Sequence, residues 1–122
     1  MLILLVLLQV KHMFADYYLQ TPRMLMGRET YLHLGRAEHA GVHGVGSVIA
    51  FVIMGTPVLF TVLIVVAEWI VHFHIDWVKA RWSVQKAHKP TDAGFWRAAG
   101  VDQAAHQLTY VTMAVAWYFA LF

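Results

Sequence analysis

Residues 58–82 read VLFTVLIVVAEWIVHFHIDWVKARW, and this stretch decides the fold class. Its first ten residues are apolar except for Thr61. A mainly apolar run of about 20 residues matches the length of a helix that crosses a bilayer. In the same run Glu68, His72 and Asp76 recur every four residues, so a helix would place them on one face. We therefore expect a membrane-spanning helix with one polar face.

Three further segments have the same character, and we expect an all-α, integral membrane, up-down bundle of four transmembrane helices. The expected helices cover residues 1–20, 34–54, 58–82 and 94–121. Thr21-Pro22 ends the first, Gly55-Thr56-Pro57 forms a short turn, and the loop 83–93 contains Pro90. Pro57 suits the first turn of a helix, and Thr91 or Asp92 can cap the last helix.

The composition agrees with a membrane protein of one domain, residues 1–122. Hydrophobic residues make up 60% of the chain and charged residues 13%, against roughly 45–50% and 25% in soluble proteins. The absence of cysteine excludes disulfides, thiolate metal sites and iron–sulfur clusters. The few basic residues lie beside apolar spans, so nothing indicates nucleic-acid binding.

The basic residues also predict an orientation. They cluster in or beside the first and third loops: Arg23, Arg28, Arg36, Lys79, Arg81, Lys86, Lys89 and Arg97. The positive-inside rule places such loops in the cytoplasm. Both termini and the Gly55-Thr56-Pro57 turn then face the other side.

Each expected helix has a pair of polar residues four positions apart. The pairs are His12 and Asp16, His39 and His43, His72 and Asp76, and Asp102 and His106. Each pair lies one to two turns, or slightly more, from the cytoplasmic end of its helix. An antiparallel bundle would bring all four pairs to one layer in the cytoplasmic half.

We interpret this layer as a metal site. An unpaired charged side chain at the bilayer centre costs roughly 2.5–3.5 kcal/mol on insertion scales. Imidazole and carboxylate without thiolate suit Zn, Mn or non-haem Fe. The candidate ligands are His12, Asp16, His39, His43, His72, Asp76, Asp102 and His106. They suffice for two metals, which would activate a water for attack on a phosphoryl or acyl group.

Four residues are candidates for the catalytic steps themselves: Asp16, Asp76, Lys79 and Asp102. Lys79 or Arg81 would stabilise the developing anion. A purely structural polar network, in which each His donates to its Asp, is the main alternative. His33, His74 and His88 are expected to be packing or interfacial residues. His74 is left out of the site because it points about 200° away from His72 on the helix.

At these residues the chain resembles a known family, the bacterial membrane proteins described as domain of unknown function 3307. The resemblance rests on Lys11-His12-x-x-Ala15-Asp16-x-x-Leu19-Gln20-Thr21, the His39/His43 region, His72-Phe73-x-Ile75-Asp76-Trp77-x-Lys79 and Asp102-Gln103-x-x-His106. It implies a multi-helix protein of the bacterial inner membrane and names no reaction. The pattern is also similar to that of membrane-bound metal-dependent hydrolases, which by analogy alone does not establish function.

Three functions remain open from the sequence. The first is a metal-dependent hydrolase acting on a membrane lipid or a lipid-linked phosphate. The second is a non-catalytic subunit of a larger respiratory or photosynthetic complex, or a homo-oligomer, with the layer as a polar network or haem site. Haem is the less favoured ligand, since each candidate His has an acidic neighbour that favours a hard cation. The third is a proton or metal-ion transporter.

Overall fold

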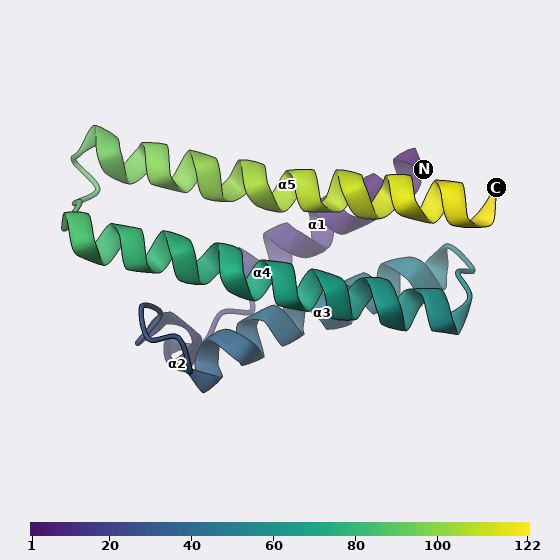
Figure 1. Ribbon diagram of the computed structural model, residues 1–122, viewed down its shortest axis with the longest axis horizontal. Helices are drawn as coiled ribbons and strands as arrows, with labels where there is room; N and C mark the ends of the chain where they lie inside the picture. The colour runs from purple at the N-terminus through teal and green to yellow at the C-terminus, as the bar shows by residue number, and fades with distance from the viewer.

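The computed structural model describes residues 1–122 and contains only helices and the loops between them. The helices are α1 (Leu2–Tyr17), α2 (Pro22–Leu25), α3 (Leu34–Ile53), α4 (Val58–Lys86) and α5 (Ala93–Leu121). Figure 1 shows α4 and α5 side by side and antiparallel, with α1 and α3 behind them. The expected all-α class is confirmed.

The four long helices form a closed ring. Helix α1 packs against α3 and α5, and α4 packs against the same two helices. Both termini and the turn between α3 and α4 lie at one end, while α2 and the loop between α4 and α5 lie at the other (Figure 1). Gly55 has a φ of 66°, a left-handed conformation that glycine adopts without the steric cost of a side chain.

The two halves of the ring differ in polarity. At the end with the termini the buried side chains are mostly apolar. Thr56 and Thr61 are buried there beside an apolar cluster that consists of Leu4, Leu8, Ala50, Phe51, Tyr110, Met113, Ala114 and Trp117. Towards the other end the buried side chains are mostly polar: His12, Arg36, His39, His43, Glu68, His72, Asp102 and His106. The same four helices thus enclose an apolar layer and a polar layer.

Helix boundaries differ slightly from those expected. Helix α4 continues past Trp82 to Lys86, because no glycine or proline interrupts residues 83–86. It ends where Ala87 takes a left-handed φ of 49°. Asp92 occupies the N-cap position of α5, but its carboxylate accepts the backbone N–H of Lys89 at 2.7 Å instead of a helix N–H.

One helix, α4, is long and apolar enough to cross a membrane by length and composition. Its most apolar 18-residue stretch has a mean hydropathy of 2.1, and 17% of that stretch is buried inside the protein. Helix α1 has only 16 residues, and α3 and α5 include charged residues in their polar halves. By length and composition alone, α4 is thus the one candidate for a membrane-spanning helix in this all-helical chain.

Candidate metal centre

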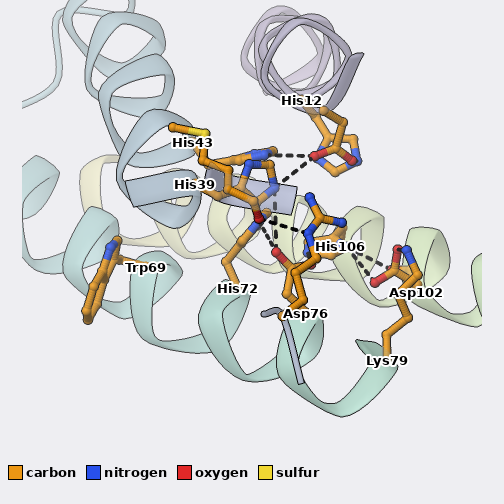
Figure 2. A network of polar contacts seen from close by, with 12 residues as sticks. His12, His39, His43, Trp69, His72, Asp76, Lys79, Asp102 and His106 are labelled. Carbon is orange, nitrogen blue, oxygen red and sulfur yellow. Dashed lines mark hydrogen bonds and ion pairs between the residues drawn. The ribbon is translucent and has the colours of Figure 1, made fainter. Parts of the chain in front are cut away.

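Side chains from all four long helices meet in the polar layer. Figure 2 shows His12, His39, His43, His72, Asp76 and His106 directed towards a common centre, while Trp69 lies to one side. The imidazole rings of His43 and His72 have centroids only 3.9 Å apart, although the residues belong to α3 and α4. The expected convergence of the His–Asp pairs is therefore present in the structure.

Asp16 of α1 is surrounded by three imidazoles. The Nε2 atoms of His43 and His39 lie 3.0 Å and 3.2 Å from its Oδ1. The Nε2 atom of His12, one turn earlier on the same helix, lies 3.2 Å from Oδ2. Two helices thus supply nitrogen atoms to one carboxylate.

Asp76 of α4 has an equivalent set of neighbours. The Nε2 atom of His72 lies 3.3 Å from Oδ2, and that of His106 lies 3.5 Å from Oδ1. His39 Nε2 is also 3.5 Å from Asp76 Oδ2. His39 therefore lies between the two carboxylates and joins the two halves of the site.

When its ring is neutral, His106 cannot donate a hydrogen bond to the Asp76 carboxylate that it faces. Its Nδ1 atom lies 2.9 Å from the backbone carbonyl oxygen of Asp102, which can only accept, so Nδ1 is the donor. The Nε2 atom of a neutral ring then bears a lone pair. This atom is buried without a hydrogen-bond partner and faces the Asp76 carboxylate. Two acceptors that face each other need a cation between them, either a proton or a metal ion.

The ligand spacing fits a metal ion. Three groups of donor atoms each lie within 4.8 Å: His39, His43 and His72; His12, Asp16 and His43; His72, Asp76 and His106. With metal–nitrogen bonds of about 2.0–2.1 Å, the edges of a tetrahedral site are roughly 3.3–3.4 Å long. Within the second and third groups, nitrogen–oxygen separations of 3.0–3.5 Å bracket this value.

A second layer of polar groups holds the imidazoles in place. The Tyr110 hydroxyl lies 2.9 Å from His12 Nδ1 and 3.4 Å from His43 Nδ1, the ring nitrogens that do not face Asp16. Tyr110 is fully buried. Such outer partners set the tautomer and the ring orientation of a ligating histidine.

Asp102 and Lys79 form a pair beside the cluster. The Asp102 carboxylate lies 3.3 Å from Lys79 Nζ and 3.8 Å from His106 Nδ1, and it belongs to none of the three donor groups. Lys79 is partly exposed. Arg81, the alternative anion partner, lies away from the cluster with its guanidinium 5.5 Å from the Trp77 ring centroid.

A small cavity at the end with α2 opens beside Lys79 and Asp76. It has a volume of about 400 Å³, and Arg28, Glu29, Asp76 and Lys79 are among the residues that line it. Asp76 therefore belongs both to the cluster and to the wall of an opening. Water and small polar molecules have a route to the carboxylate through this cavity.

A buried ion pair lies on the far side of the cluster from this opening. Lys11 Nζ contacts the carboxylate of Glu68, and it also donates to the His43 carbonyl oxygen at 3.2 Å. Both side chains are almost inaccessible to solvent. The stem of Lys11 packs on Gly46, where an added Cβ would approach the Lys11 Cβ atom to 3.1 Å.

The remaining histidines lie outside the cluster, as expected. His74 is exposed and interacts with the Ile70 carbonyl and the Tyr31 hydroxyl. The rings of His33 and His88 pack against Gly27 and Gly94, where a Cβ would collide with them.

The structure buries two residues that are not among the His and Asp pairs of the sequence, Tyr110 and Arg36. Tyr110 continues the stripe of Asp102 and His106, and it contacts His12 on another helix. Arg36 is 1% exposed and donates to the backbone carbonyls of Arg28, Thr30 and Tyr31. The spacing of three residues between Arg36 and His39 places both on the same helix face, and this signal could have located Arg36.

Comparison with known proteins identifies the family. The family model described as "Protein of unknown function (DUF3307)" matches residues 3–121, so the chain belongs to this family. No curated protein and no solved structure matches the chain. The expected family is thus confirmed over nearly the whole chain.

Proposed function

We propose that this member of the DUF3307 family is an integral membrane protein that binds two divalent cations between its four long helices. With these cations it hydrolyses a phosphate ester of a lipid or lipid-linked substrate at the cytoplasmic surface. The observation on which the metal site depends is the unpartnered His106 Nε2 atom that faces Asp76.

The distribution of apolar side chains supports the membrane location. Val52 of α3, Val58 of α4 and Leu108 of α5 are 66%, 79% and 66% exposed, whereas the imidazoles are buried. A soluble bundle would bury the apolar faces and expose the charged ones. Lipid would cover the apolar exterior, and the polar layer would lie near the basic end, on the cytoplasmic side.

The donor set supports particular metals. One ion would be held by His12, Asp16 and His43 and the other by His72, Asp76 and His106, with His39 between them. Nitrogen and carboxylate ligands without sulfur suit Zn, Mn or Fe. The close packing of the imidazole rings favours single ions over a porphyrin.

When bound, two such ions would polarise a phosphoryl oxygen and make a water easier to deprotonate at neutral pH. The chain's own groups would complete the reaction. Asp76, on the wall of the small cavity, would accept a proton as the water oxygen attacks phosphorus. Lys79 would stabilise the charge on the phosphoryl oxygens, with Asp102 holding its ammonium in place. As the P–O ester bond breaks, the departing oxygen takes up that proton, so one water yields phosphate and an alcohol.

The test is metal analysis of the detergent-purified protein, followed by an assay of phosphate release from phosphatidic acid. We expect about two divalent ions per chain, in line with a two-metal site, and fewer in Asp76→Asn. His74→Ala removes an imidazole outside the cluster and should leave the metal content unchanged. Failure to take up Zn, Mn or Fe at a fixed ratio would refute the metal site. Bound metal without phosphate release would refute only the hydrolase.

One observation favours a second candidate, a proton or metal-ion transporter. The Lys11–Glu68 pair extends the polar layer deeper into the bundle, behind His43. Chains of ionisable residues inside a membrane often form ion pathways. Reconstituted vesicles would then show a proton or metal flux that Glu68→Gln abolishes, and tight vesicles without flux would exclude this candidate.

A further inference from the structure

A second and larger cavity lies between α4 and α5, on the outside of the bundle. Its volume is about 860 Å³, within the range of roughly 300–1,000 Å³ that is typical of small-molecule sites. We call it the α4–α5 groove. Its apolar wall consists of Ile75, Val78, Trp82, Ala98, Val101 and Ala105. Several of these side chains are exposed, so the groove opens sideways rather than into the bundle.

Lys79 and Asp102 connect this groove to the metal centre. Both residues line it, and their side chains are 3.3 Å apart. Asp102 lies one helical turn before His106, whose Nε2 atom faces Asp76. Lys79 also lines the small cavity beside Asp76. A group bound at Lys79 in the groove would therefore lie next to the carboxylate and imidazole cluster.

The charge of the groove favours an anion. Its charged residues are Lys79 and Arg97 on the basic side and Asp102 on the acidic side, and His74 and His88 are its other polar residues. Asp102 is already paired with Lys79. The Arg97 side chain is exposed and makes no ion pair or hydrogen bond. One fixed positive charge thus remains unbalanced at the mouth of the groove.

Polarity changes along the groove in the direction that a lipid requires. Arg97 and His88 lie towards the loop between the two helices, where the His88 ring packs on Gly94. Val101 and Ala105 lie about 6 Å and 12 Å further along α5, at about 1.5 Å of rise per residue. Ile75 and Val78 face them from α4. Arg97 and His88 thus lie at the basic loop, whereas the deeper part is mainly apolar, with His74 and the paired Asp102 as its polar side chains.

We propose that the α4–α5 groove binds one apolar chain of a phosphate-bearing membrane lipid, with the phosphate at Lys79 and Arg97. The chain lies against Val78, Val101 and Ala105, and the lipid enters from the bilayer without leaving it. As a substrate site, the groove rests on the hydrolase function proposed above. Binding itself depends only on the groove and can be measured separately.

The experiment is native mass spectrometry of the full-length protein in detergent, titrated with three probes. Phosphatidic acid has both the phosphate and the acyl chains, diacylglycerol has only the chains, and glycerol 3-phosphate has only the phosphate. We expect phosphatidic acid alone to form a one-to-one complex. Equal binding of glycerol 3-phosphate would overturn the lipid assignment, and equal binding of diacylglycerol would overturn the role of the two basic residues.

Matched variants test the two parts of the groove. Arg97→Gln should weaken phosphatidic acid binding by about tenfold, as expected when one charge-assisted contact is lost, whereas Lys89→Gln in the adjacent loop should not. Ala105→Trp should fill the groove and abolish binding, whereas Ala104→Trp, on the exposed face of the same helix, should not. Equal effects within either pair would overturn the proposal.

The same mass spectra distinguish lipid binding in the groove from metal binding and from dimer formation. Lipid binding without bound metal would keep the groove and refute the metal site. Bound metal without lipid binding would refute the groove and leave the metal site intact. A dimer that Ala105→Trp dissociates would show that a second copy of the chain occupies the groove, and it would overturn the lipid assignment.

Discussion

The Nε2 atom of His43 lies 3.0 Å from Oδ1 of Asp16, although the two residues belong to different helices and are 27 positions apart. His12, which precedes Asp16 by one turn, is no closer to the carboxylate, at 3.2 Å. The candidate metal centre is therefore a contact between helices, not a set of separate His–Asp pairs. Predictions about metal content and stability follow from this arrangement.

Removal of metal should destabilise the protein. A ligand at 100 times its dissociation constant stabilises the folded state by about 2.7 kcal/mol. In a chain of this length, that corresponds to a fall in melting temperature of roughly 10 °C after treatment with a chelator. Differential scanning fluorimetry in detergent measures the shift. If the melting temperature neither falls after chelation nor rises when Zn, Mn or Fe is added, the cluster is a metal-free polar network.

Tyr110→Phe should weaken metal binding without unfolding the bundle. The hydroxyl contacts His12 Nδ1 at 2.9 Å, and loss of such an outer partner typically lowers metal affinity by about 10–100-fold. Competition with a chromogenic chelator measures the affinity. Tyr118→Phe is the matched control, since this exposed tyrosine on the same helix makes no hydrogen bond through its hydroxyl.

Glu68→Leu should destabilise the bundle by about 3–5 kcal/mol, because it leaves the Lys11 ammonium buried without a carboxylate to balance its charge. The double variant Lys11→Met/Glu68→Leu should regain most of this loss, since an apolar pair of similar volume is often as stable as a buried ion pair. Denaturant unfolding followed by circular dichroism gives both values. A double variant as unstable as the single one would show that the two charges do not act as a pair.

Arg36→Met should loosen the segment between α2 and α3. The guanidinium donates to the carbonyls of Arg28, Thr30 and Tyr31, and its carbon Cζ lies 4.3 Å from the Phe73 ring centroid. A methionine would leave these carbonyls without their donor. We expect faster tryptic cleavage after Arg28, read by mass spectrometry. Arg23→Met removes only an exposed ion pair with Glu38 and should leave the cleavage rate unchanged.

The proposed orientation can be tested by labelling, because the chain has no cysteine of its own. Single cysteines at Lys89 and at Met54 should react with an impermeant maleimide from opposite sides of sealed inverted membrane vesicles. The Lys89 position should be accessible on the cytoplasmic side. Labelling of both positions from the same side would exclude the four-span arrangement.

The sequence by itself predicted the features that depend on local geometry. The apolar run in residues 58–82 indicated α4, and the interval of four residues placed His72 and Asp76 on one face because an α-helix repeats every 3.6 residues. The same periodicity excluded His74 from the site. The end of α4 was less predictable, since residues 83–86 are compatible with either helix or loop.

Only the tertiary structure decided which partners meet. The stripes showed that Asp16 and Asp102 each lie near a histidine, yet Asp16 also contacts His39 and His43, whereas Asp102 pairs with Lys79. These distances depend on how far each helix is rotated about its axis and where it crosses its neighbours. The packing of side chains from all the helices sets both quantities, and no single segment of the sequence contains that information.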